Sequence, residues 1–86
     1  MKYRILFTKQ AEKDLKKVAA SELKQKAYRL LSVLEEDPQQ PPYEKLVGFQ
    51  NVYSRRINIQ HRLVYRIDEE EKCVVIIRMW THYGDN

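Results

Sequence analysis

The sequence predicts an α+β fold, β-α-α-β-β-β, in which two helices cover one face of a mainly antiparallel sheet. Three observations predict it. Two segments in the first half repeat apolar residues at helical spacing, a later segment alternates apolar and polar residues as a strand does, and the last is an apolar run typical of a buried strand. At 86 residues the chain has room for one domain, 1–86, with a modest core.

The first predicted strand is the apolar run at residues 3–7. Thr8 then predicts a helix start, because its hydroxyl can accept a hydrogen bond from an amide of the first turn. Ser21 is expected to cap a second, longer helix that ends near Glu36, because Asp37 precedes a proline and is disfavoured in helical geometry.

The apolar stripes of the two helices are expected to meet as an antiparallel hairpin against the sheet. They consist of Ala11, Leu15, Val18 and Ala19 in the first helix and Leu23, Ala27, Leu30, Leu31 and Leu34 in the second. Residues 38–42 form an extended, proline-containing loop that carries Tyr43, Glu44 and Lys45 to a fixed place. Gly48 marks the turn that follows.

The stretch 53–66 combines basic residues with side chains that favour strands. Its basic or potentially basic members are Arg55, Arg56, His61, Arg62 and Arg66. A break at residues 58–60 predicts a tight hairpin. In its second strand, strict alternation places Leu63, Tyr65 and Ile67 toward the core and Arg62, Val64 and Arg66 toward the outside.

A hairpin holds its arginines in place, and their planar, charged forks match phosphate oxygens in pairs. This arrangement favours a fixed anion-binding face, and the alternative is the polar outer face of an ordinary sheet. After an acidic turn at residues 68–72, the apolar run 73–77 predicts a buried strand that continues to His82 and Tyr83.

The composition favours an anionic partner. The net charge is +4 and the pI about 9.3. Eight of the nine lysines lie in the first fifty residues, whereas the predicted strands of the second half carry Arg55, Arg56, Arg62, Arg66 and Arg78. Cys73 is the only cysteine, so no intrachain disulfide is expected. We expect a cytoplasmic protein without a membrane partner, because we find neither a signal-like segment nor a membrane-length apolar run.

Residue types also bear on the chemistry. With two glycines, two histidines and no Cys-x-x-Cys or His-Glu-x-x-His pattern, we expect neither a metal nor another cofactor. What remains is an acid and base set with cations: Glu44 in the loop, Arg56 and Arg62 on the hairpin, and His82 with Tyr83 at the end of the last strand.

RNA can be cleaved by its own 2′-OH if a base, an acid and cations surround the phosphate, and these side chains supply those parts. Each side chain taken singly also fits an ordinary surface or packing role. His61 is left out of the set, because alternation places it on the strand face opposite Arg62.

At these residues the chain resembles the Txe/YoeB-type toxins of the RelE superfamily. The resemblance rests on Glu44-Lys45-Leu46, Ser54-Arg55-Arg56-Ile57, His61-Arg62-Leu63-Val64-Tyr65 and His82-Tyr83, which follow in the family's order and spacing. It implies a RelE-like twisted sheet with two helices on one face. It also implies the toxin of a type II toxin-antitoxin system, an endoribonuclease that cleaves mRNA in the ribosomal A site and so inhibits translation.

The resemblance implies a role for each matching residue. Glu44 would be the general base, Arg62 would stabilise the scissile phosphate, His82 would be the general acid and Tyr83 would lie beside the substrate. The expected RNA or phosphate contacts are Arg55, Arg56 and Lys45. The implied partners are a cognate YefM/Axe-type antitoxin, acidic and partly disordered when free, and mRNA on the 70S ribosome, and a homodimer is compatible with it.

Two alternatives stay open at the level of sequence. One is an RNA- or ribosome-binding module without catalysis, including a toxin relative that has lost its activity. The other is a small regulatory or DNA-binding module that works within an antitoxin complex, although no helix rich in base-reading side chains is evident.

Overall fold

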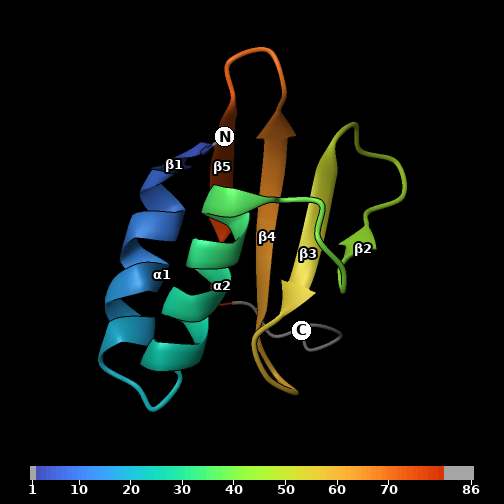
Figure 1. Ribbon diagram of the computed structural model, residues 1–86. Helices are drawn as coiled ribbons and strands as arrows, with labels where there is room; N and C mark the ends of the chain where they lie inside the picture. Colours follow the sequence, from blue (N-terminus) through green and yellow to red (C-terminus); the bar gives the residue numbers. More distant parts are fainter. Residues whose placement is uncertain (1, 81–86) are drawn as a thin grey trace.

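The computed structural model describes residues 2–80, and Figure 1 shows two helices lying side by side in front of a sheet. The elements are β1 (Arg4–Phe7), α1 (Lys9–Ala19), α2 (Lys24–Glu36), β2 (Glu44–Lys45), β3 (Val52–Arg56), β4 (Arg62–Asp68) and β5 (Cys73–Arg78). The predicted α+β class and the helical hairpin on one face are confirmed. His82 and Tyr83 lie outside the described residues.

The strands form one mixed sheet in the order β1-β5-β4-β3-β2. β1 pairs with β5 in parallel, and the other neighbours are antiparallel. β2 was not expected from the sequence. It has two residues, Glu44 and Lys45, which pair with Ser54 and Tyr53, and two residues are too few to show a period.

The core lies between the helices and one face of the sheet. Leu63, Tyr65 and Ile67 of β4 are buried, whereas Arg62, Val64 and Arg66 are more exposed, as alternation predicts. The core cluster contains Ala11, Val18, Ala27 and Leu34 from the helices and Tyr53, Ile57, Leu63, Tyr65, Ile67, Val74, Ile76 and Met79 from the second half of the chain. Among residues 2–80, no helix is long and apolar enough to cross a membrane.

One of the two predicted helix caps is confirmed. The Thr8 hydroxyl accepts from the Ala11 amide at 3.0 Å and donates to the Ile77 carbonyl at 3.0 Å, which ties the start of α1 to β5. Ser21 does not cap α2, which begins at Lys24. Its hydroxyl donates to the Val18 carbonyl and accepts from the Leu23 amide, and so closes the turn between the helices.

β5 ends at Arg78, and does not run on as a strand through Trp80 as the sequence suggested. Two structural reasons are visible. Tyr65 pairs with Ile76 while Val64 pairs with Arg78, so β5 contains one extra residue, a bulge that bends the strand. Beyond the bulge, a side chain of α1 takes the next backbone amides.

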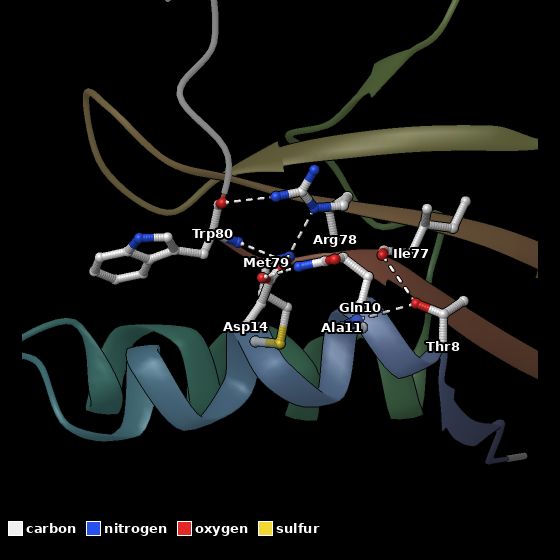
Figure 2. Close-up of polar contacts among 8 residues, drawn as sticks. All are labelled: Thr8, Gln10, Ala11, Asp14, Ile77, Arg78, Met79 and Trp80. Carbon is white, nitrogen blue, oxygen red and sulfur yellow. Dashed lines mark hydrogen bonds and ion pairs between the residues drawn. The ribbon is translucent and has the colours of Figure 1, made fainter.

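That side chain is Asp14, which is fully buried (Figure 2). Its Oδ2 accepts from the amides of Met79 at 3.0 Å and Trp80 at 3.2 Å, and from Arg78 Nε at 3.1 Å. Its Oδ1 accepts from the Gln10 side-chain amide at 2.9 Å. Burial acts to raise the pKa of Asp14, but these four hydrogen bonds outweigh it and lower the pKa below its ordinary value.

Asp14→Asn should lower the free energy of unfolding by about 2 kcal/mol near pH 7, because it weakens hydrogen bonds to a buried charge. Since the pKa of Asp14 is lower in the folded chain, its stabilisation is present above the unfolded pKa, near about 4, and is lost as pH falls through the folded pKa. Urea unfolding of both proteins from about pH 7 to pH 2 should show the difference shrinking below about pH 4. A pH-independent difference would contradict this assignment, and Glu12→Gln on the same helix is the control.

Candidate active site

A carboxylate from the loop and an arginine from the hairpin meet on one face of the sheet. Glu44 in β2 pairs with Ser54 in β3, and Ser54 pairs with Val64 in β4, so these residues share that face. Arg62 Nη1 donates to Glu44 Oε1 at 2.7 Å and to Ser54 Oγ at 3.3 Å. The Arg62 side chain is 12% exposed and that of Glu44 63%, so a held cation presents an accessible carboxylate.

Arg56 brings a second cation to the same place. It pairs with Arg62 across β3 and β4, so both side chains leave the same face of the sheet. Like charges directly opposite each other are unfavourable unless an anion lies between or beside them. Glu44 offsets one of the two charges, and the remaining positive charge favours a bound anion.

These residues line an open cleft of about 390 Å³ at the edge of the sheet. Its lining consists of Leu30, Pro42, Tyr43, Glu44, Ser54, Arg55, Arg56 and Arg62. One part of the lining is apolar or aromatic and the other carries a carboxylate and guanidinium groups. A cleft of this kind suits a ligand with an apolar ring and an anionic group, and a nucleotide has both.

The structure gives Arg55 a role other than the expected phosphate contact. Its side chain lies inside the protein, 3% exposed. Its Nε donates to the Tyr65 hydroxyl at 2.9 Å, Nη1 to the Pro42 carbonyl at 3.1 Å and Nη2 to the Pro38 carbonyl at 3.0 Å. The guanidinium thus ties the loop before β2 to the sheet, because it satisfies a buried loop carbonyl and a partly buried one.

Three more residues were expected at the site: Lys45, His82 and Tyr83. Lys45 is exposed and pairs with Tyr53, one position from Glu44 along β2, so alternation turns it to the other face, and it does not line the cleft. The roles predicted for His82 and Tyr83 lie outside the described residues. The structure therefore brings together Glu44, Arg56 and Arg62.

Two residues of the site region were missed from the sequence. Ser54 is fully buried and its hydroxyl contacts Arg62; its position two residues before Arg56 in a strand was the available signal. Tyr43, beside Glu44, packs edge-on against Tyr53 with ring centroids 5.4 Å apart and lines the cleft. His61 does not line the cleft. It is 4% exposed, and its ring stacks on Trp80 with centroids 4.0 Å apart.

Within residues 2–80, no three histidine, cysteine, aspartate or glutamate side chains gather as a metal site would require. The groups that the described cleft offers a ligand are the carboxylate of Glu44, the hydroxyls of Tyr43 and Ser54, and guanidinium groups. Such a set can bind a phosphodiester, accept a proton and stabilise negative charge.

The fold matches those of solved toxins. A YoeB/ParE toxin from Agrobacterium tumefaciens superposes with a TM-score of 0.83 at 24% identity, over 93% of this chain and 99% of that one. A YoeB dimer from Staphylococcus aureus gives 0.81 at 30% identity, over 96% and 100%. An archaeal RelE-RelB complex from Pyrococcus horikoshii gives 0.74 at 22%, over 94% and 96%. Comparison with curated proteins gives no significant match.

The likeness at 30% identity over nearly the whole chain defines a toxin of the RelE superfamily, of the YoeB type. The model of the ParE toxin of type II toxin-antitoxin systems, parDE, matches residues 5–85. The chain therefore belongs to the ParE toxin family and is the toxin of a type II toxin-antitoxin system.

Arg55→Lys should lower the free energy of unfolding by about 2 kcal/mol, or the melting temperature by about 10 °C, because an ammonium cannot reach all three acceptors. Arg56→Lys, one residue along on the exposed side, should change it by less than about 0.5 kcal/mol. Thermal unfolding followed by circular dichroism measures both. Equal melting temperatures for the two variants would refute the structural role of Arg55.

Proposed function

We propose that this toxin is a ribosome-dependent endoribonuclease that cleaves mRNA in the A site without a metal ion. The observation that carries the proposal is the 2.7 Å contact between Glu44 and Arg62 in an open cleft that also contains Arg56. A base and cations stand where one phosphodiester can reach them. Toxins of this superfamily are generally endoribonucleases, which supports the same reaction.

In the proposed mechanism the RNA supplies the nucleophile. Glu44 accepts the proton of the 2′-OH, whose oxygen attacks the adjacent phosphorus. Arg62 and Arg56 stabilise the charge that develops on the phosphorane oxygens. His82 protonates the departing 5′ oxygen and Tyr83 lies beside the substrate, in the roles that the resemblance implies. The products are a 2′,3′-cyclic phosphate, which can open to a 3′-phosphate, and a 5′-hydroxyl.

The arrangement of charges in the cleft is more favourable with an anionic transition state bound than with the cleft empty. Arg56 and Arg62 lie opposite each other, and the Glu44 carboxylate contacts Arg62. A phosphate that enters between them relieves their repulsion, and the relief grows as the phosphorane gains charge. Because Arg62 is largely buried, the cation is held before the substrate arrives and little reorganisation is needed.

The proposed partners follow from charge and from the relatives. We infer a cognate antitoxin of the YefM/Axe type, an acidic chain that covers the arginine-lined cleft. The Staphylococcus aureus YoeB toxin, similar to this chain at 30% identity, has been crystallised with YefM as a heterotetramer. That YoeB also forms a dimer, so a homodimer is proposed for the free toxin.

Removal of a cleft residue should slow cleavage of mRNA on purified ribosomes. Arg62→Ala should lower kcat by about 10² to 10³, because a fixed cation at a developing oxyanion is lost. Glu44→Gln should lower it by about 10² to 10⁴, as loss of a general base does. Because no metal ion takes part in the proposed reaction, EDTA should not change the rate when the free Mg²⁺ concentration that keeps the ribosome intact is restored. Lys16→Ala, on the exposed side of α1, is the control.

A double variant tests the assignment most strongly. If Glu44→Ala combined with His82→Ala cuts as fast as the parent, the proposed chemistry is wrong. If the parent binds ribosomes and RNA but cuts nothing, the chain is instead a binding module.

Arg56 should contribute mainly through phosphate binding. Arg56→Ala should weaken binding of single-stranded RNA and reduce the slope of log K against log salt by about 0.7, the value for one phosphate contact. Fluorescence anisotropy across a salt series measures it. Lys16→Ala should leave the slope unchanged, and an equal change in both variants would show that binding is diffuse.

A further inference from the structure

One buried charged group takes no part in the proposed mechanism. Asp14 lies in the middle of α1 and is fully buried, and it does not line the cleft. A buried carboxylate is costly unless hydrogen bonds compensate for the lost water. Here three of the four donors belong to residues at the end of β5 (Figure 2). The carboxylate thus fixes one point of the chain, where β5 has ended.

The fixed point determines where Trp80 lies. The Trp80 amide donates to Asp14 Oδ2 at 3.2 Å, and the Trp80 carbonyl accepts from Arg78 Nη2 at 3.2 Å. Arg78 Nε in turn donates to the same carboxylate oxygen. Both backbone polar groups of Trp80 are therefore held, directly or through Arg78, by the carboxylate of Asp14, which restricts the directions in which the indole can point.

The indole of Trp80 stacks on His61, with ring centroids 4.0 Å apart and an angle of 23° between the planes. His61 closes the hairpin turn between β3 and β4. Its carbonyl accepts from the amides of Ile57 at 2.9 Å and Asn58 at 3.2 Å, and its own amide donates to Asn58 Oδ1 at 2.7 Å. Trp80 therefore packs against His61, the residue whose hydrogen bonds set the geometry of this turn.

Arg62 follows His61 directly and is the first residue of β4. Its direction into the cleft depends on the backbone that leaves the turn, because a side chain is oriented by its own strand position. A continuous series of contacts thus leads from α1 to the cleft, through Asp14, Trp80, His61 and Arg62.

We propose that Asp14 is a positioning residue for the cleft, which acts by holding Trp80 against His61 and so keeps Arg62 aimed at Glu44. The inference rests on the proposed function for its kinetic test, but its structural part stands without it. A group that positions a catalytic cation affects the rate of the chemical step more than it affects substrate binding.

The kinetic experiment compares the full chain with Asp14→Ala, Asp14→Asn and the control Val18→Ala, all well below their melting temperatures. Val18 is a buried apolar residue of the same helix, so its truncation destabilises the fold without touching the end of β5. Asp14→Ala should lower kcat on ribosome-bound mRNA about 10- to 100-fold, with KM within about twofold. Asp14→Asn, which keeps an acceptor for the two amides, should recover most of the loss, and Val18→Ala should keep the parent kcat.

A double-mutant cycle separates positioning from general loss of stability. If Asp14 acts through His61, then His61→Ala combined with Asp14→Ala should lose little more activity than the more impaired single variant. If the fold-losses of kcat in the two single variants multiply in the double variant, the proposed path is overturned. A loss of kcat in Val18→Ala as large as that in Asp14→Ala would also overturn it.

Spectroscopy tests the same contacts without RNA. Trp80 is the only tryptophan, so its emission should shift to the red and lose quenching by the imidazole in Asp14→Ala, but not in Val18→Ala. The Arg62 Nε resonance should move in Asp14→Ala alone. If the parent cuts no RNA while both signals change as described, the proposed function fails and the positioning stands; unchanged signals in Asp14→Ala overturn the positioning.

Discussion

The pairing of β3 with β4 is the constraint on which both the core and the cleft depend. Its register places Tyr53 opposite Tyr65 on the core face, and Arg56 opposite Arg62 on the other. A slip of one residue would exchange the two faces, since successive side chains in a strand point in opposite directions. The turn at Asn58 and His61 fixes the register through three hydrogen bonds. The burial that stabilises the sheet therefore also selects which arginines reach the cleft.

Arg55 and Arg56 show how this constraint divides similar residues between different roles. Both are arginines in one strand, yet Arg55 is buried beneath the loop and Arg56 is exposed at the cleft. Burial raises the pKa of the Tyr65 phenol. The Tyr65 hydroxyl accepts from Arg55 Nε and donates to the Pro38 carbonyl at 3.4 Å. Arg55 thus holds the loop that carries Glu44, while Glu44 itself contacts Arg62.

The cleft keeps one unfavourable arrangement of charge, the pairing of Arg56 with Arg62. Two arginines face each other, and a buried serine and a partly exposed carboxylate compensate only in part. In α1, the charged carboxylate of Asp14 is buried, and four hydrogen bonds offset the cost of that burial. Sites that bind charged substrates commonly keep such unfavourable features, because the substrate or the transition state relieves them. The stability that supports them comes from the apolar contacts between the helices and the sheet.

The sequence by itself determined the features that depend on near neighbours in the chain. The Thr8 cap, the end of α2 before Pro38, the helical stripes and the alternation in β4 all follow from local hydrogen bonding and side-chain periodicity. Glu44 and Arg62, which the resemblance named, do lie together. Asp14 carried a signal that was overlooked, since it occupies a buried position of α1 three residues after Ala11 and four before Val18.

Only the tertiary structure decided the rest, because those features depend on residues far apart in the chain. Whether Arg55 or Arg56 is buried depends on where the loop after α2 crosses the sheet. The two-residue strand β2 exists because β3 offers it an edge, and the end of β5 is set by a bulge and by a carboxylate from α1. Such contacts form between segments that no local pattern relates, so their geometry appears only when the helices and the sheet are packed together.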